Sequence, residues 1–411
     1  MYRRLFVLML LGAPICLSAQ PDSPSGSRIP TIPLGRIVAA CADSLGAQAT
    51  ARALSNGSVL VSDYARHRVL LFDSTLTHGV SVIDSIASAS NFQTAAQLIP
   101  YRGDSTLFVD VATNVLLVID QTGKLARTMA LPKPRDSRYL AGTIFGAAGI
   151  DAKGRLVYRA AYPMVVNTPP AGSPTLMAMP SQPDSGVIVR ADFDSRTVDT
   201  LTTLKIMQTE SAMTMKQDGR GNITMKITIN PVDAGDEWAM LSDGTIAIVR
   251  AHDYHVDWMD PDGTRRSSAK MPFDWRPVTA EQKQKLIDSL RPIYQRQIEG
   301  MPARKTTTPE GERDFRTEID FVSLRQMPDY EPPIGQGSVK ADRKGNLWIL
   351  PHTSLSARGG VLYDVVNKRG EITKRVQLPA GYALIGFGNG DDVFVIRVSG
   401  KTGFIEKASV N

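Results

Sequence analysis

Apolar and polar residues alternate along most of the chain in short runs, and each run follows a tight turn. Six runs begin with Gly, Asn or Asp in the turn and span residues 54–63, 100–110, 150–159, 240–249, 341–350 and 386–398. These residue types tolerate the positive φ angles of tight hairpins, and period-two alternation is typical of strands with one buried face. Each run therefore predicts a β-hairpin.

A second element follows the hairpins: a strand that ends in an acidic or amide residue and leads into another turn. Asp73, Asp120, Asp192, Asp260 and Asn367 occupy equivalent positions in this element. Such side chains accept hydrogen bonds from their own turn, although a calcium site at a turn such as 260–263 is an alternative. The two elements together predict a four-stranded antiparallel unit of about 40 residues, and about six such units are typical of a β-propeller.

The last unit, residues 381–411, has only three predicted strands. We expect residues 31–41 to supply the missing outer strand and to close the ring, which would leave no open sheet edge. The sequence thus predicts an all-β, six-bladed β-propeller over residues 31–411, preceded by a flexible segment, 20–30. An additional hairpin at 218–229 leaves seven blades as the alternative.

Three long connections interrupt the units, at residues 158–186, 207–231 and 273–334. Each connection begins after the second or the fourth strand of a blade. These strands finish at the same end of the blade, so we expect all three connections at one mouth of the central channel. Long loops in a compact repeat protein are usually functional or disordered. The insertion at 273–334 is interpreted either as a lid over the channel or as a solvated decoration on its rim.

The insertion at 273–334 lies between the fourth and fifth blades and is predicted to be partly helical. Thr279 and Gln282 have the spacing of a capping box, and the apolar residues 286, 287 and 290 share one helical face. We expect the helix to break at Pro292, because proline cannot donate the backbone hydrogen bond. Residues 302–314 are expected to be irregular.

The first 19 residues are typical of a secretory signal peptide. Arg3 and Arg4 precede a short apolar core, and small residues lead to a predicted cleavage site near Ala19. A lipoprotein that uses Cys16 is the alternative. No later apolar run approaches the roughly 20 residues that span a bilayer, so an exported, soluble protein in the periplasm or outside the cell is expected.

Charge and cysteine content narrow the classes of partner. Loss of Arg3 and Arg4 lowers the net charge from +6 by two, to +4, which is too mild to indicate a nucleic-acid partner. Cys41 is then the only cysteine, so no internal disulfide can form. We expect a monomer stabilised by burial of apolar surface.

Basic and aromatic residues gather in the loops at the expected mouth. Four of the five histidines lie there, with arginines beside them. The candidate ligand-binding residues are Arg66, His67, Arg250, His252, Tyr254, His255, Trp275, Arg276, His352 and Arg358. In an alternative, His67, His255 and His352 converge on a zinc or calcium ion, since imidazole is a common metal ligand and the loops lean toward one axis.

The stretch at 61–73, VSDYARHRVLLFD, resembles the NHL repeat. The matching residues are Asp63, His67, Arg68 and Asp73, whereas Ala65 and Arg66 stand where Gly and Asn are common. The match is specific in motif only in this first unit, but the whole chain resembles exported six-bladed propellers of the NHL and TolB-like groups. The resemblance implies functions from protein-binding modules to lyases and lactonases, including an amidating lyase that uses converging histidines.

No catalytic motif of the G-x-S-x-G, H-E-x-x-H or C-x-x-C type occurs. We therefore expect a binding module without catalytic residues or cofactor, which recognises a peptide, glycan or partner protein at the mouth that carries the long loops. The alternative is a metal-dependent lyase or lactonase-type hydrolase that uses the three histidines. A propeller that serves only as a scaffold in a larger assembly is the third interpretation.

Overall fold

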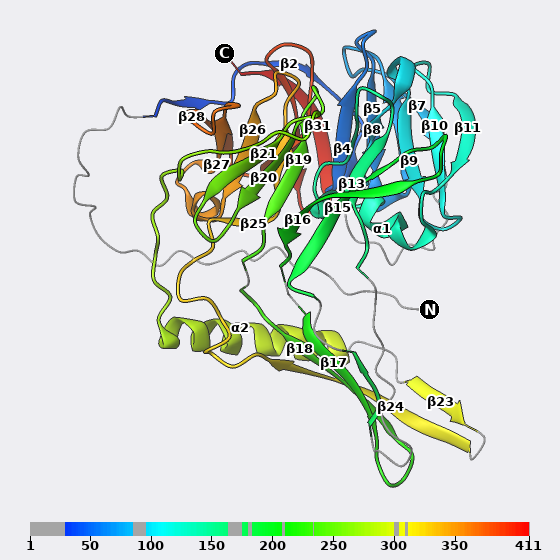
Figure 1. Cartoon of the computed structure of the whole chain (residues 1–411), viewed down its shortest axis with the longest axis vertical. Helices are drawn as coiled ribbons and strands as arrows, with labels where there is room; N and C mark the ends of the chain where they lie inside the picture. Colours follow the sequence, from blue (N-terminus) through cyan, green and yellow to red (C-terminus); the bar gives the residue numbers. More distant parts are fainter. Residues whose placement is uncertain are drawn as a thin grey trace.

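The computed structural model describes residues 29–84, 96–162, 175–179, 183–207, 210–232, 234–299, 304–308 and 311–410. The predicted signal peptide lies outside these residues. The described chain is mostly β and is divided into seven small sheets, so the predicted fold class is confirmed at this level (Figure 1).

The first three sheets are antiparallel and follow the chain from strand to strand. Sheet one contains β4 (Ala49–Ala53), β5 (Val59–Asp63), β6 (Arg68–Phe72) and β7 (Gly79–Ile83). Sheet two contains β8 (Ile99–Pro100), β9 (Thr106–Asp110), β10 (Val115–Ile119) and β11 (Leu125–Ala130). Sheet three contains β12 (Gly149–Ile150), β13 (Leu156–Arg159), β15 (Ser185–Ala191) and β16 (Val198–Lys205).

The next three sheets repeat the arrangement. Sheet four contains β19 (Glu237–Met240), β20 (Ile246–Arg250), β21 (His255–Met259) and β22 (Arg265–Ser267). Sheet five contains β25 (Ile334–Ala341), β26 (Leu347–Pro351), β27 (Gly360–Val366) and β28 (Ile372–Pro379). Sheet six contains β29 (Tyr382–Phe387), β30 (Asp392–Ser399) and β31 (Thr402–Ser409).

Short helical turns connect several of these strands. They are η1 (Tyr64–Arg66), η2 (Arg102–Asp104), η3 (Pro134–Asp136), α1 (Ser137–Ala141), η4 (Thr143–Phe145) and η5 (His352–Ser356).

The N-terminal segment divides between two sheets, so the prediction that residues 31–41 supply the outer strand of the last unit is confirmed for residues 37–40 and wrong for residues 31–33. β2 (Ile37–Ala40) pairs antiparallel with β31 at the outside of sheet six, and β3 (Leu45–Gly46) also bonds to β31. β1 (Thr31–Pro33) instead lies parallel on β28 of sheet five. The chain changes sheets at Gly35, where a Cβ atom would lie 2.1 Å from the carbonyl oxygen of Ser409, so only glycine fits.

Buried apolar residues pack between neighbouring sheets. Leu60 and Phe108 join sheets one and two, Leu116 and Tyr158 join two and three, and Ile188 and Trp238 join three and four. Val249 and Ile349 join sheets four and five, Val365 and Val395 join five and six, and Phe394 and Val61 join six and one. The alternation in the sequence thus supplies two apolar faces for each sheet, one for each neighbour.

The three long insertions meet in a seventh sheet, which the sequence did not predict. Its order is β14 (Thr175–Met179), β17 (Glu210–Gln217), β18 (Ile223–Ile229), β24 (Gly311–Phe321) and β23 (Arg304–Thr308). β18 and β24 pair in parallel, in the register Ile223 to Phe315. Figure 1 shows this sheet and its helix apart from the other six sheets. The hairpin at 218–229 therefore belongs to the insertion sheet, and the irregular segment expected at 302–314 contains strands.

Helix α2 (Ala280–Glu299) covers the insertion sheet. The capping box is confirmed: the Thr279 N–H donates to Gln282 Oε1 at 2.8 Å, and the Gln282 N–H donates to Thr279 Oγ1 at 3.2 Å. The predicted break at Pro292 was wrong, because the helix continues to Glu299. The apolar face of α2 explains this continuity. The residues at 286, 287 and 290, together with Ile293 beyond the proline, pack on the insertion sheet at Ile227 and not on the rim of the six sheets.

A buried lysine connects α2 to the segment that returns from the insertion. The Lys283 ammonium donates to the carbonyl oxygens of Leu324 and Met327 at 3.2 and 3.0 Å, and it pairs with Asp329 at 2.8 Å. None of the helices in the described part of the chain is both long and apolar enough to cross a membrane.

We expect Lys283→Met to loosen the returning segment, because both carbonyl groups would lose their donor inside the protein. The cost should be about 2 kcal/mol, measured as faster amide exchange and earlier proteolysis within residues 311–330. The control is Lys285→Met, since Lys285 is exposed and its ion pair in the described part of the chain is with Glu281 on the same helix. Equal exchange rates in the two variants would contradict this role for Lys283.

Candidate functional site

The insertions leave the six sheets at one end. They follow β13, the second strand of its sheet, and β16 and β22, the fourth strands of theirs. Alternate strands of an antiparallel sheet run in the same direction, so these three strands finish on the same side. Most of the candidate residues from the sequence lie in turns at this end, which we call the insertion end.

Arg66 and His67 close the turn between β5 and β6. Arg66 donates to the hydroxyl oxygen of Ser44 at 2.9 Å and to the carbonyl oxygen of the same residue. His67 has a left-handed conformation with φ of 56° and ends η1, and its ring meets that of Tyr64 edge-on at 6.0 Å. Both residues have structural contacts that a turn of this shape needs.

Arg250 and His255 lie in an ion network within sheet four. Arg250 pairs with Asp236 and with Asp257, both at 2.7 Å, and His255 contacts Asp253 at 2.8 Å and Asp257 at 3.2 Å. Partial burial would raise the pKa of Asp257, but hydrogen bonds from Ser267 and Arg250 lower it overall. The basic residues that the sequence places at this mouth are therefore paired with acids at this sheet.

The other two candidates of sheet four differ in their exposure. His252 is exposed, and its Nε2 lies 2.6 Å from the Lys205 ammonium, a geometry in which the neutral imidazole accepts the hydrogen bond. Tyr254 is 1% exposed with φ of 43°, and burial raises the pKa of its phenol. Tyr254 is therefore a core residue that packs against Phe273, with a ring distance of 5.5 Å.

The three histidines of the metal alternative do not converge. Within the described ranges, no group of three or more His, Cys, Asp or Glu side chains lies close enough together to hold a metal ion. Four of the five turn residues behave as the simpler interpretation predicts: the carboxylates of Asp73, Asp120 and Asp192 and the amide oxygen of Asn367 accept hydrogen bonds from backbone N–H groups of their own turns. The carboxylate of Asp260 instead accepts a hydrogen bond from Thr245 Oγ1 at 3.2 Å and pairs with Arg266 at 3.5 Å.

An exposed aromatic surface lies where the insertion leaves and rejoins the six sheets. Trp275 is 38% exposed and Tyr330 is 50% exposed, and their rings meet edge-on with centroids 6.3 Å apart. The two segments are held together because the Glu331 N–H donates to the Arg276 carbonyl at 2.9 Å. Phe273 contacts Trp275 at 5.1 Å, so the pair is anchored to the core.

Turn η5 extends this surface. The His352 N–H donates to the Pro333 carbonyl at 2.8 Å, which places η5 beside the segment that carries Tyr330. His352 is exposed, and Leu355 on the same turn is 55% exposed. We call Trp275, Tyr330, His352 and Leu355 the rim patch. Arg276, which pairs with Asp274, and the exposed Arg358 lie in the same segments.

A second cluster at the insertion end contains a buried arginine that the sequence analysis missed. Arg159, at the end of β13, is 8% exposed, and its guanidinium lies 5.4 and 5.5 Å from the ring centroids of Tyr139 and Phe145. These two rings stack at 4.4 Å. The Arg159 Nε has no hydrogen-bond partner within the described structure, and burial lowers the pKa of this guanidinium.

Glu237, at the start of β19, is the acidic member of this cluster. Burial raises its pKa to about 8, although the Gly337 N–H, which donates at 2.9 Å, and the charges of Arg159 and Lys340 act in the opposite direction. Burial also lowers the pKa of Lys340. Burial thus favours the protonated, neutral form of the Glu237 carboxyl, while the Arg159 guanidinium stays charged because arginine does not deprotonate in proteins.

Two signals in the sequence could have identified this cluster. Arg159 ends an otherwise apolar strand immediately before the first long insertion, and Glu237 begins the apolar run 237–240. A charge at the end of a buried strand is uncommon and needs a partner. What the sequence could not show was that residues 78 positions apart lie together.

Comparisons with known proteins give a similarity of fold only. No family model matches the sequence, and no significant match exists among curated proteins. A gluconolactonase from Xanthomonas campestris is 12% identical with a TM-score of 0.41, over 94% of this chain and 99% of that one. Virginiamycin B lyase from Staphylococcus aureus is 10% identical with a TM-score of 0.38, over 90% and 99%.

A member of the DUF4221 family from Bacteroides vulgatus is 9% identical with a TM-score of 0.45, over 90% of this chain and 98% of that one. At such identities and scores, the similarities are no argument for a shared activity.

Proposed function

We propose that this protein is an exported binding module that recognises a peptide, glycan or partner protein through the rim patch. The observation that carries the proposal is the exposed Trp275–Tyr330 pair. Trp and Tyr supply large, rigid contact areas with a polar edge, and they are the side chains on which binding surfaces most often depend.

The distribution of exposed apolar side chains supports this choice. The other large apolar residues that are exposed in the described ranges, Ile37, Val38, Val80 and Leu125, are aliphatic and lie on the outer strands β2, β7 and β11. The rim patch combines two aromatic rings from neighbouring segments of the insertion with an imidazole and a leucine from turn η5. Contiguous patches of this composition commonly mark interaction sites.

The scaffold in this proposal is a six-bladed β-propeller. Six consecutive antiparallel sheets, with apolar clusters between each pair of neighbours and between the sixth and the first, support it. The insertion sheet would then be an addition at one mouth, and it would hold the two segments that carry Trp275 and Tyr330. We also propose that the module is a monomer, is exported after cleavage near Ala19, needs no metal ion and does not bind nucleic acid.

The test begins with the purified chain on peptide and glycan arrays, followed by affinity measurements on the ligands that bind. Trp275→Ala/Tyr330→Ala should weaken binding at least about tenfold, because truncation of central aromatic anchors typically costs more than 1.4 kcal/mol. The matched control is Val80→Ser/Leu125→Ser, which removes exposed apolar side chains from outer strands and should leave affinity unchanged.

Two results would contradict the proposal: equal affinity of the aromatic double variant and the wild type, or equal losses in both double variants. Binding should also persist in a chelator. Its loss on chelation, together with stoichiometric zinc or calcium in elemental analysis, would favour the metal-dependent alternative.

A further inference from the structure

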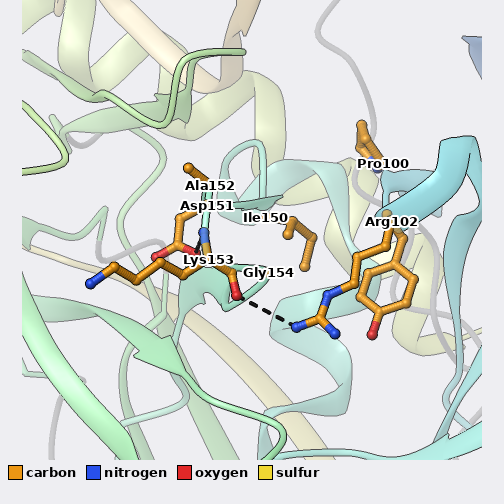
Figure 2. Close-up of a pocket in the computed structure, with 8 residues that line it drawn as sticks. Pro100, Arg102, Ile150, Asp151, Ala152, Lys153 and Gly154 are labelled. Atoms are coloured by element: carbon orange, nitrogen blue, oxygen red, sulfur yellow. Dashed lines mark hydrogen bonds between the residues drawn. The ribbon is translucent and has the colours of Figure 1, made fainter.

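A depression lies at the opposite end of the sheets, between the first turn of sheet two and the first turn of sheet three. Residues 100–102 form one wall and residues 150–154 form the other, around a volume of about 400 Å³ (Figure 2). These turns precede β9 and β13, whereas the first insertion follows β13. The depression and the rim patch are therefore at different ends of the molecule.

The charge in this depression is positive. Arg102 and Lys153 are exposed, and neither forms an ion pair within the described structure. The one carboxylate of the walls, Asp151, is occupied: its Oδ2 pairs with Arg155 at 2.7 Å, and its Oδ1 accepts the backbone N–H groups of Lys153 and Arg155 at 3.0 and 2.9 Å. The two free cations thus have no internal counter-ion.

A third cation lies behind Arg102. Arg127 donates to the Tyr101 hydroxyl at 3.2 Å, and its guanidinium carbon lies 6.0 Å from the ring centroid. Arg102 lies 5.9 Å from the same ring. Arg127 adds positive potential to the depression without contributing to its walls.

The guanidinium of Arg102 lies where a glycine leaves room for it. Gly154 has φ of 78°, and a Cβ atom there would lie 2.3 Å from both Nε and Nη2 of Arg102. Figure 2 shows the side chain extended from its own turn toward Lys153 and Gly154 on the facing turn, with Nη2 3.5 Å from the Lys153 carbonyl oxygen. This contact is long for a hydrogen bond, so nearly all the donor capacity of the planar group remains.

The walls also indicate the size and polarity of the rest of the ligand, which we call its body. Pro100, Ile150 and Ala152 contribute apolar surface beside the cations. A volume of this size suits a compact ligand and not a macromolecule. A guanidinium binds carboxylate, sulfate and phosphate groups in a bidentate manner, and an ammonium adds a second point charge.

We propose that this depression is a binding site for a small organic anion, with Arg102 as the bidentate donor to its oxyanion and Lys153 as the second positive charge. The site is independent of the rim patch, so each can fail without the other. Its ligand carries one carboxylate, sulfate or phosphate group on a compact body.

The test is calorimetry and thermal shift on the full chain at low ionic strength, with glucuronate, glucose 6-phosphate, inorganic phosphate and glucose as probes. The charged sugars should bind with a Kd of about 1 mM or tighter, and glucose should not bind. Arg102→Met should weaken binding about tenfold, and Arg102→Lys should restore only part of it, because the planar fork is lost. Lys153→Met should weaken binding about threefold.

The control is Lys124→Met. Lys124 follows a turn of the same sheet, but the adjoining Gly123 packs on Leu71 and Val82 of sheet one, away from the depression. Trp275→Ala/Tyr330→Ala should also bind the charged probes normally. Equal affinities for inorganic phosphate and the charged sugars would show that the site recognises the oxyanion alone. A higher affinity for the charged sugars would show that the apolar walls also recognise the body of the ligand.

Any of three results would overturn the proposal. These are no binding of a charged probe at about 10 mM, equal affinity for glucose and glucuronate, or unchanged affinity in Arg102→Met.

Discussion

Gly146→Ala is expected to lower the free energy of unfolding by about 3–5 kcal/mol. Gly146 has φ of 93° and ψ of 173°, a backbone region that only glycine adopts readily. A Cβ atom there would lie 2.1 Å from Trp238 Nε1. The same indole N–H donates to the Phe145 carbonyl at 2.7 Å, so the added methyl group would also break a partly buried hydrogen bond between η4 and sheet four.

The measurement is chemical denaturation followed by tryptophan fluorescence. The matched control is Gly263→Ala, since Gly263 has φ of 91° but no heavy atom within 4 Å of its Cβ position. That control isolates the backbone cost, which should be about 1 kcal/mol. Similar losses in the two variants would show that the indole of Trp238 can move away without penalty.

Glu237→Gln is expected to remove a dependence of stability on pH. In the native state the pKa of Glu237 is raised to about 8, and its usual value is 4.5. Between these values the native state holds a proton that the unfolded state has released. Stability from this group is therefore fully present below pH 4.5 and is lost as the pH rises toward 8.

The difference should reach a few kcal/mol at pH 8, since each unit of pKa shift corresponds to about 1.4 kcal/mol. Wild type and Glu237→Gln should thus have similar stability near pH 5, and the variant should be more stable at pH 8. Denaturation at a series of pH values measures this divergence. Glu318→Gln, at an exposed position on β24, serves as the control and should parallel the wild type.

A constant difference between wild type and Glu237→Gln across the pH range would contradict this account. Such a result would mean that Arg159 and Lys340 keep the carboxylate ionised in spite of burial.

The sequence predicted strand and turn positions well for local reasons. The turn at 260–263 and the alternation around it need only neighbouring residues, and the capping box of Thr279 and Gln282 spans three positions. Pro292 misled the prediction because its local preference was outweighed by the apolar face of α2 on the insertion sheet. Residues 304–308, which form β23, were missed because all of them are polar and show no apolar alternation. They form a strand because they pair with β24, which follows in the same hairpin.

The candidate site was predicted less well than the fold. Trp275 and Arg276 precede the helix of the insertion by a few positions, so their place at the start of the insertion follows from the sequence alone. Arg250 and His255 were candidates for ligand binding, and the structure pairs them with Asp236 and Asp257. Tyr330, which completes the aromatic pair, lies 55 residues from Trp275, and no periodic pattern connects the two.

What the sequence alone determined was a chain of short antiparallel strands with two apolar faces, because period-two patterning and turn residues act over a few positions. Only the tertiary structure decided that three separate insertions form one sheet and that most cations of the insertion end have partners. It also decided that an exposed aromatic pair and a positively charged depression lie at opposite ends. These features depend on contacts between residues far apart in the chain, whose charges and rings acquire their environment only when the sheets pack.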